Sequence, residues 1–160
     1  INMRFFILGE SEREYSFVDA PATFEVNKEY SDKPTPTIVV RKYGDAWNKP
    51  FTVVYEPTSG LTDNGSVVNV DKLQKDGIFK GLCVKSIIEG KELIQYIIIQ
   101  NATETFKIRD IEFFGHFAIV SYSDGKLKDV YVGNGRKISV GGKVFYDSKS
   151  GEGNFYLNSI

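Results

Sequence analysis

The fold of this chain is decided by the stretch Phe117-Ala-Ile-Val-Ser-Tyr-Ser-Asp124-Gly125-Lys-Leu-Lys-Asp-Val-Tyr-Val132. Apolar and polar residues alternate on both sides of its centre, which is the two-residue period of a strand with one buried face. At the centre, Asp124 and Gly125 both tolerate the positive φ angles that a two-residue type I′ turn requires. The stretch therefore predicts a β-hairpin and antiparallel neighbours.

The same alternation recurs along almost the whole chain. Gly141-Gly142 predicts a second tight hairpin, and Glu89-Gly90 marks a further turn. Helical periodicity is almost absent, and only residues 70–76 could form a single helical turn. About a dozen short strands at regular spacing predict an all-β, antiparallel β-sandwich that is jelly-roll-like, with a barrel as second choice.

We expect separate strands in these segments: Arg4–Leu8, Glu14–Val18, Thr37–Tyr43, Phe51–Glu56, Ser66–Leu73, Phe79–Ile88, Leu93–Asn101, Thr105–Ile108, Ile111–Phe114, Phe117–Ser123, Lys126–Val132, Lys137–Val140, Lys143–Tyr146 and Asn154–Leu157.

Length and composition limit the domain organisation and the partners. The chain has 160 residues, 41% of them hydrophobic and 26% charged, so one globular domain over residues 1–160 is expected. The formal net charge of −1 argues against nucleic acid, because binding phosphates needs a basic face. No run approaches the roughly 18 apolar residues of a membrane-spanning helix, so no membrane partner is expected.

The N-terminus suggests a piece of a longer polypeptide. The chain begins with Ile1-Asn2, and its first apolar run, Arg4 to Leu8, is too short for a signal peptide. We therefore expect the domain to come from a larger multidomain protein whose export signal would lie upstream.

Candidates for catalysis and metal binding are few. His116 is the only histidine, which excludes sites built from several imidazoles, and the lone Cys83 excludes a cysteine-rich zinc site. We expect no metal and no cofactor. As a catalytic base His116 would need an orienting partner and a pocket, so it is a weak candidate. Its alternative role is a polar residue beside a glycine bulge.

Charged side chains give two further weak candidates. A catalytic carboxylate pair could form in space from Glu56, Asp110, Glu112 and Asp129, although such groups more often lie on a solvated face. Basic residues also recur in consecutive hairpins, where they could contact an anionic polymer or simply face solvent. They are Lys126, Lys128, Arg136, Lys137 and Lys143.

A second informative block spans residues 36–57 and contains the only tryptophan, Trp47. Arg41 and Glu56 each end an apolar run. If these two strands paired antiparallel, the two side chains could form a structural ion pair that fixes the loop between them.

The same block also allows a ligand-binding interpretation. Trp47 has a large, rigid apolar face with a polar N–H, which suits stacking against a sugar ring. Tyr43, Tyr55 and Arg41 would complete this binding set. The residues alone leave the structural pair and the binding set both open.

A resemblance rests on the segments Pro34-Thr-Pro-Thr-Ile-Val-Val-Arg41, Gly44-Asp-Ala-Trp47, Pro50-Phe51 and Val53-Val-Tyr-Glu-Pro57. In these segments, and more loosely over residues 1–120, the chain is similar to the C-terminal β-sandwich region of heparinase II/III-like polysaccharide lyases. In that family the implied architecture is a catalytic helical toroid followed by β-sheet domains. This chain has no toroid-like helical segment, so the resemblance carries no catalytic residue onto it.

The resemblance implies a non-catalytic accessory domain of a bacterial, secreted or periplasmic enzyme. Its expected partner is the catalytic domain of the same parent chain, whose glycan cleft it would border, with an acidic polysaccharide as a further candidate. Such a domain would expose an apolar patch that the parent protein covers. The alternatives are a self-sufficient carbohydrate-binding module and, less favoured, an independent lyase or glycosidase.

Overall fold

The computed structural model describes residues 2–10, 12–21, 33–44, 49–59, 65–102 and 104–158. The chain divides into two compact units, one formed by Ile1–Leu8 with Pro50–Ile160 and the other by Gly9–Lys49. Each unit is described by itself, and the expectation of a single domain stays a prediction. None of the described residues forms a helix that is long and apolar enough to span a membrane.

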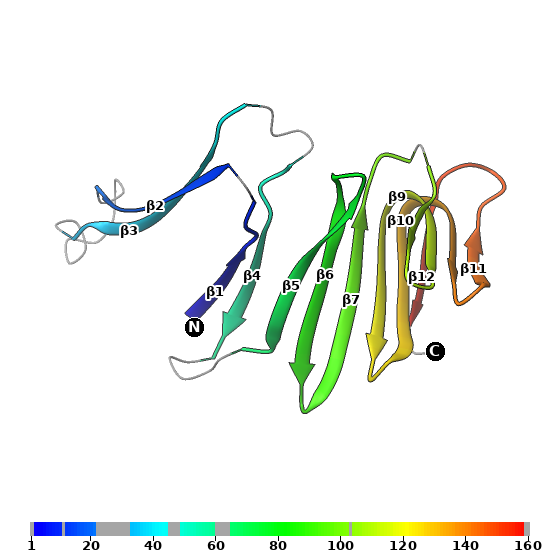
Figure 1. Ribbon diagram of the computed structural model, residues 1–160. Helices are drawn as coiled ribbons and strands as arrows, with labels where there is room; N and C mark the ends of the chain where they lie inside the picture. The colour runs from blue at the N-terminus through cyan, green and yellow to red at the C-terminus, as the bar shows by residue number, and fades with distance from the viewer. Residues whose placement is uncertain are drawn as a thin grey trace. The chain divides into compact units, whose positions relative to one another are not determined.

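Every regular element in the described part of the chain is a strand, and all pairs are antiparallel (Figure 1). The predicted all-β, antiparallel fold with about a dozen strands is confirmed. The strands are β1 (Asn2–Ile7), β2 (Arg13–Ala20), β3 (Thr35–Lys42), β4 (Val53–Thr58), β5 (Val67–Lys75), β6 (Ile78–Ile88), β7 (Lys91–Ile99), β8 (Phe106–Ile108), β9 (Ile111–Ser123), β10 (Lys126–Val140), β11 (Lys143–Asp147) and β12 (Gly153–Asn158).

Tight turns of the predicted kind join the strands of the larger unit. Asp124 and Gly125 have φ angles of 48° and 77°, and they connect β9 to β10 as the sequence predicts. Gly141-Gly142 and Glu89-Gly90 also have positive φ at both positions. Because such turns match the right-handed twist of paired strands, they fix the hairpin register locally.

The larger sheet is a meander with the strand order β11-β10-β9-β7-β6-β5, to which β12 adds on β10 and β8 adds on β9. The two long strands, β9 and β10, change neighbours part-way along. The first part of β9 pairs with β8 and the second with β7, while β10 pairs first with β12 and then with β11. The sheet therefore has two halves that share one long hairpin.

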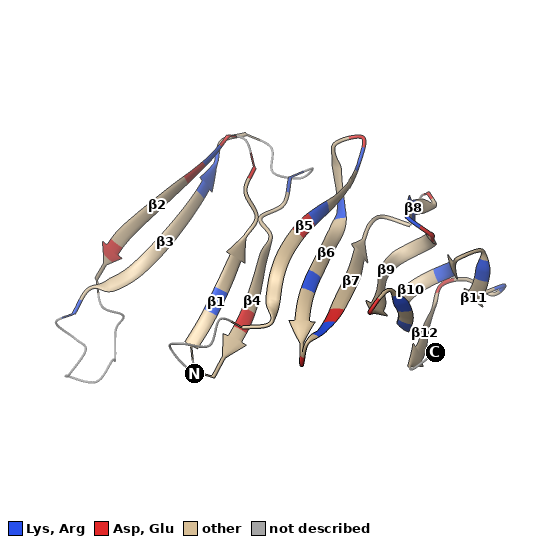
Figure 2. Ribbon diagram, turned by 60° about the horizontal axis from the view of Figure 1, so that its bottom comes forward, with Lys and Arg blue, Asp and Glu red and all other residues tan. Residues whose placement is uncertain are grey.

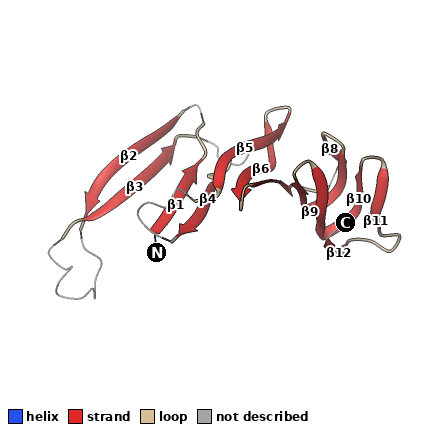
Figure 3. Ribbon diagram, turned by 90° about the horizontal axis from the view of Figure 1, so that it is seen from below, coloured by secondary structure: helices blue, strands red, loops and turns tan. Residues whose placement is uncertain are grey.

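Gly115 and Gly135 face each other where these neighbours change. A Cβ atom on Gly115 would lie 2.5 Å from the Cα of Gly135, and the register shifts between Gly135 and Lys137. A bulge of this kind bends a strand pair and increases its twist. Figure 3 shows β8, β9, β10 and β11 curled together at this end of the sheet.

One hydrophobic core lies between the two halves of the bent sheet, which gives the predicted sandwich. Fully buried Phe106, Phe113 and Ile138 come from one half, and Val120 and Val130 come from the other. All belong to a single packed cluster. Burying a side chain of this size contributes about 1.5–3 kcal/mol to stability. Because the bend brings these side chains of the two halves together, it creates the main apolar contact of the unit.

The predicted division of two long strands into shorter ones is wrong in both places. Residues 111–123 form one continuous strand, not two, and so do residues 126–140. Gly115, Gly133 and Gly135 lie inside these two strands. They bend the strands without ending them, because a bulge leaves the ladder intact on both sides.

We predict that Gly115→Ala destabilises the chain by about 1–3 kcal/mol, because the added methyl group would force the two backbones apart. The measurement is the urea unfolding midpoint. Gly9→Ala is the control, since a Cβ there meets nothing within 4 Å. Equal midpoints for the two variants would contradict the proposed role of the contact.

Candidate functional site

The predicted sugar-stacking residues belong to different parts of the chain. Trp47 lies outside the described residues. Tyr43 belongs to the smaller unit, where its ring lies 5.0 Å from the guanidinium carbon of Arg41. Tyr55 belongs to the larger unit, is 63% exposed and meets Phe5 edge-on at 5.2 Å. The binding set around Trp47 stays a prediction.

The strands β3 and β4, which carry Arg41 and Glu56, do not pair with each other in the described residues, so the strand pairing assumed for an Arg41–Glu56 ion pair is not found and the ion pair itself stays a prediction. β3 pairs with β2, which places Arg41 opposite Glu14, and the Arg41 Nε donates to Glu14 Oε2 at 3.1 Å. β4 pairs with β1, which places Glu56 opposite Arg4 at 3.0 Å. Each charge therefore finds its partner on the adjacent strand.

Glu56 organises the segment that leads into β5. Its carboxylate accepts hydrogen bonds from the Ser66 and Val67 N–H groups, the Ser66 hydroxyl and the Arg4 guanidinium. Gly65 has a φ of 70°, and a Cβ there would lie 2.5 Å from Glu56 Oε2, so only glycine leaves room for this arrangement. Burial raises the pKa of Glu56, but the four hydrogen bonds outweigh it and the pKa lies below its ordinary value.

Glu56→Gln should destabilise the chain by about 1–3 kcal/mol, since the amide N–H₂ would replace an oxygen that accepts from Arg4. Because the folded pKa is lowered, the carboxylate contributes stability at neutral pH. That contribution is lost as the pH falls below the ordinary value of 4.5 and through the folded pKa. The measurement is the free energy of unfolding of both proteins against pH. A difference that stays constant on acidification would contradict the assignment.

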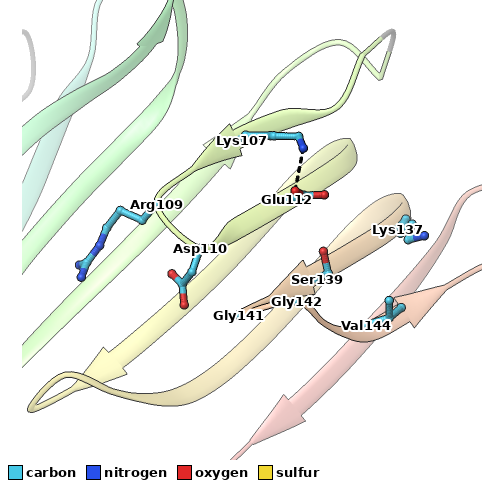
Figure 4. A pocket seen from close by; sticks show the side chains of 9 residues that line it. All are labelled: Lys107, Arg109, Asp110, Glu112, Lys137, Ser139, Gly141, Gly142 and Val144. Carbon is cyan, nitrogen blue, oxygen red and sulfur yellow. Dashed lines mark hydrogen bonds and ion pairs between the residues drawn. The ribbon is translucent and has the colours of Figure 1, made fainter.

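A hollow of about 460 Å³ lies at the other end of the larger unit (Figure 4). Its lining combines cations, carboxylates and a hydroxyl: Lys107, Arg109, Asp110, Glu112, Lys137, Ser139, Gly141, Gly142 and Val144. The sequence named Asp110 and Glu112 as carboxylates and Lys137 as part of a basic group, and the structure brings these three together.

The charges in the hollow are already partnered within the protein. Glu112 accepts from Lys107 Nζ at 2.7 Å, and Lys137 lies 3.4 Å from Asp147. Asp110 accepts from the Tyr122 hydroxyl at 2.8 Å. These contacts are better explained as exposed ion pairs and turn contacts than as an acid–base pair.

Tyr122, behind the hollow, is poorly suited to proton abstraction. The Arg109 guanidinium donates to the Tyr96 hydroxyl at 3.0 Å, and the Tyr96 and Tyr122 rings meet edge-on. Burial, followed by the hydrogen bond to Asp110, raises the pKa of Tyr122 far above its ordinary value. A phenol held protonated in this way stabilises structure and does not act as a base near neutral pH.

His116 lies elsewhere, on the exposed surface of β9. Its side chain is 46% exposed, and Nε2 lies 3.4 Å from Glu152, which is also 3.9 Å from Arg136. It has a carboxylate partner but does not line the hollow of Figure 4. Among the described residues, no group of three His, Cys, Asp or Glu side chains could hold a metal ion.

Sequence reasoning missed a row of aromatic side chains on β9, β10 and β12. The rings of Phe117 and Tyr131 lie 5.9 Å apart, and those of Tyr131 and Tyr156 lie 6.3 Å apart, measured between centroids. Strand alternation could have marked Tyr131 and Tyr156 as outward-facing. Only the long-range pairing of β12 with β10, which local sequence does not reveal, brings them together.

The fold and surface define an antiparallel β-module with exposed aromatic and apolar strands. Residues 67–156 match the model of the endo-acting ulvan lyase C-terminal domain family, and the chain belongs to this family. It is 33% identical over 140 residues to an endo-acting ulvan lyase of Formosa agariphila. The match covers 85% of the chain, which spans only 17% of the length of that relative. No solved structure matches the chain.

These comparisons confirm that the chain is a domain of a polysaccharide lyase, but they do not confirm the more specific heparinase II/III-like family that the resemblance implied. The chain is a C-terminal domain of polysaccharide lyase type. The family that matches is one of ulvan lyases, and the comparisons do not single out heparinase II/III-like enzymes.

Proposed function

We propose that this chain is a non-catalytic accessory domain of a polysaccharide-degrading enzyme, and that it packs on a catalytic domain of the same polypeptide. The observation that carries the proposal is the exposed apolar surface of the ribbon formed by β2 and β3. Phe17 is 80% exposed there, and it lies directly opposite exposed Ile38. A two-stranded ribbon of this kind is at best marginally stable in water unless something packs against it.

Both faces of the ribbon carry apolar side chains. Phe17 and Ile38 share one face with Tyr15, while Val18 and Val39 lie on the other face, and all five are exposed. Contiguous exposed apolar surface on a domain marks an interaction site. This is the kind of patch that an accessory domain is expected to present to its parent enzyme.

The ribbon of β1 and β4 in the larger unit repeats the pattern. Phe5 lies opposite Tyr55 and Met3 lies opposite Pro57 in the antiparallel register. Met3, Phe5 and Tyr55 are all exposed, while Glu56 and Thr58 on the same strand are buried. The face with Glu56 and Thr58 is therefore covered by other residues of the larger unit, and the face with Phe5 and Tyr55 is open to a partner.

The comparisons support a partner within the same polypeptide. The matched family is described as a C-terminal domain, and the chain covers only a small part of the Formosa agariphila relative. The heparinase II/III-like resemblance extends the proposal to a toroid-shaped catalytic domain whose glycan cleft the sandwich borders. An enzyme that meets polysaccharides outside the cell would be secreted or periplasmic, and this localisation is part of the proposal.

The chain alone should show no lyase activity. On incubation with ulvan we expect no rise in the ultraviolet absorbance of unsaturated uronates, because the described structure brings no base and pocket together around His116. The control is the full-length Formosa agariphila relative. A rise in absorbance, whether or not His116→Ala abolished it, would overturn the non-catalytic part of the proposal.

Phe17→Ser should weaken the association between this domain and the catalytic part of its polypeptide by about tenfold, since it removes a large exposed anchor. The two parts would be expressed separately and titrated by calorimetry. Val144→Ser, which changes an exposed apolar residue on β11, is the matched control. Equal affinities for the two variants, or no association of the unchanged parts, would overturn the docking role.

A further inference from the structure

We propose that the row formed by Phe117, Tyr131 and Tyr156, here called the aromatic row, binds a single chain of an acidic polysaccharide. This inference takes one element from the proposed function, namely that the ligand is a polysaccharide. The row uses different residues from the Trp47 set and different strands from the docking ribbons.

The aromatic row lies on the face of the sheet opposite the core. Tyr131 stands between Val130 and Val132 on β10, and both valines are fully buried in the core. Because side chains alternate along a strand, Tyr131 points to the other face. Tyr131 is 37% exposed and Tyr156, its direct neighbour on β12, is 60% exposed. The row is thus open to solvent from the side away from the core.

The ring geometry suits an extended sugar chain. Successive centroids are 5.9 and 6.3 Å apart, which is comparable to the spacing of sugar rings along a polysaccharide. Neighbouring ring planes are inclined by 69° and 59°. A coplanar set would fit a flat, crystalline surface, whereas tilted rings fit one twisted chain in solution. Each ring offers an apolar face, and each tyrosine adds a hydroxyl.

Amide side chains flank the row where it ends on β12. Asn154 and Asn158 are exposed and lie two residues on either side of Tyr156, so all three share one face of the strand. The Asn154 carbonyl oxygen accepts from the Asn134 N–H at 2.9 Å, which fixes the orientation of that amide. Amides both donate and accept hydrogen bonds, as sugar hydroxyls require.

The charge around the row favours an acidic ligand. The strand that carries Tyr131 has four cationic side chains and one acidic one, the latter being Asp129. Lys128 and Arg136 lie on either side of Tyr131 and are about half exposed. Their ion pairs are long, 4.0 Å to Asp129 and 3.9 Å to Glu152. Figure 2 shows Lys and Arg positions in blue on β10, whereas its partner strand β12 has no charged residue.

Cross-strand packing alone explains only part of the row. A Cβ atom on Gly133 would lie 3.2 Å from the Phe117 ring and 3.3 Å from the Tyr131 ring, so these two rings cover the glycine backbone. Aromatic cover of a strand glycine stabilises a sheet. Tyr156 is not needed for that cover and remains mostly exposed, and it lengthens the row toward the amides.

The test is affinity electrophoresis of the 160-residue chain in gels that contain ulvan, polygalacturonate or dextran. We expect the first two to retard the unchanged protein and dextran, which is neutral, not to do so. Tyr156→Ala should weaken binding by about tenfold. Ile88→Ala is the control, because Ile88 is an apolar strand residue at the end of β6, is 47% exposed and belongs to none of the proposed sites.

A second variant, Lys128→Gln with Arg136→Gln, changes only exposed side chains and should weaken binding to both acidic polymers and flatten its dependence on salt. The proposal is overturned if no polymer retards the unchanged protein, if Tyr156→Ala binds as tightly as Ile88→Ala, or if dextran retards the protein as strongly as the acidic polymers. These results are independent of the Phe17→Ser titration, so a failure of the aromatic row leaves the docking role standing, and the reverse also holds.

Discussion

The close approach of β9 and β10 at Gly115 and Gly135 is the constraint on which the larger unit depends. Two strands of more than a dozen residues each would otherwise form a flat, open ribbon. At the glycine pair neither residue has a Cβ, so the backbones come together and the adjacent bulge bends the hairpin. The neighbours change on both edges at that point, and the two halves enclose the core.

The bend also determines which surfaces are left for function. Every second residue of β9 and β10 points into the bend and is buried in the core, as Val120 and Val130 are. The residues between them face outward, where Tyr131 meets Tyr156 across the ladder. A sheet with one covered face and one solvated face can therefore carry aromatic side chains without losing core packing. The aromatic row is a consequence of this arrangement of the strands.

Local features could be predicted from the sequence, and long-range pairings could not. Asp124 and Gly125 reveal their turn because positive φ is a property of single residues. The partner of Glu56 depends on whether β4 pairs with β1 or with β3, and the whole smaller unit, Gly9–Lys49, lies between β1 and β4 in the sequence. The apolar runs that end at Arg41 and Glu56 are similar in composition, so alternation alone could not distinguish the two pairings. For the same reason, the sequence could not predict that Tyr156 lies beside Tyr131.

Under the two proposals, docking and glycan binding reinforce each other because they use different strands. A row of three aromatic rings on an exposed sheet face is expected to bind a sugar chain only weakly when the domain is alone. If the domain is attached to a catalytic domain, binding at the row raises the effective concentration of polysaccharide at the cleft without any new contact there. The gain depends on a fixed distance between the two sites, and a rigid apolar interface supplies that distance better than a flexible linker. An apolar ribbon and an aromatic row in one small chain are therefore more useful together than either is alone.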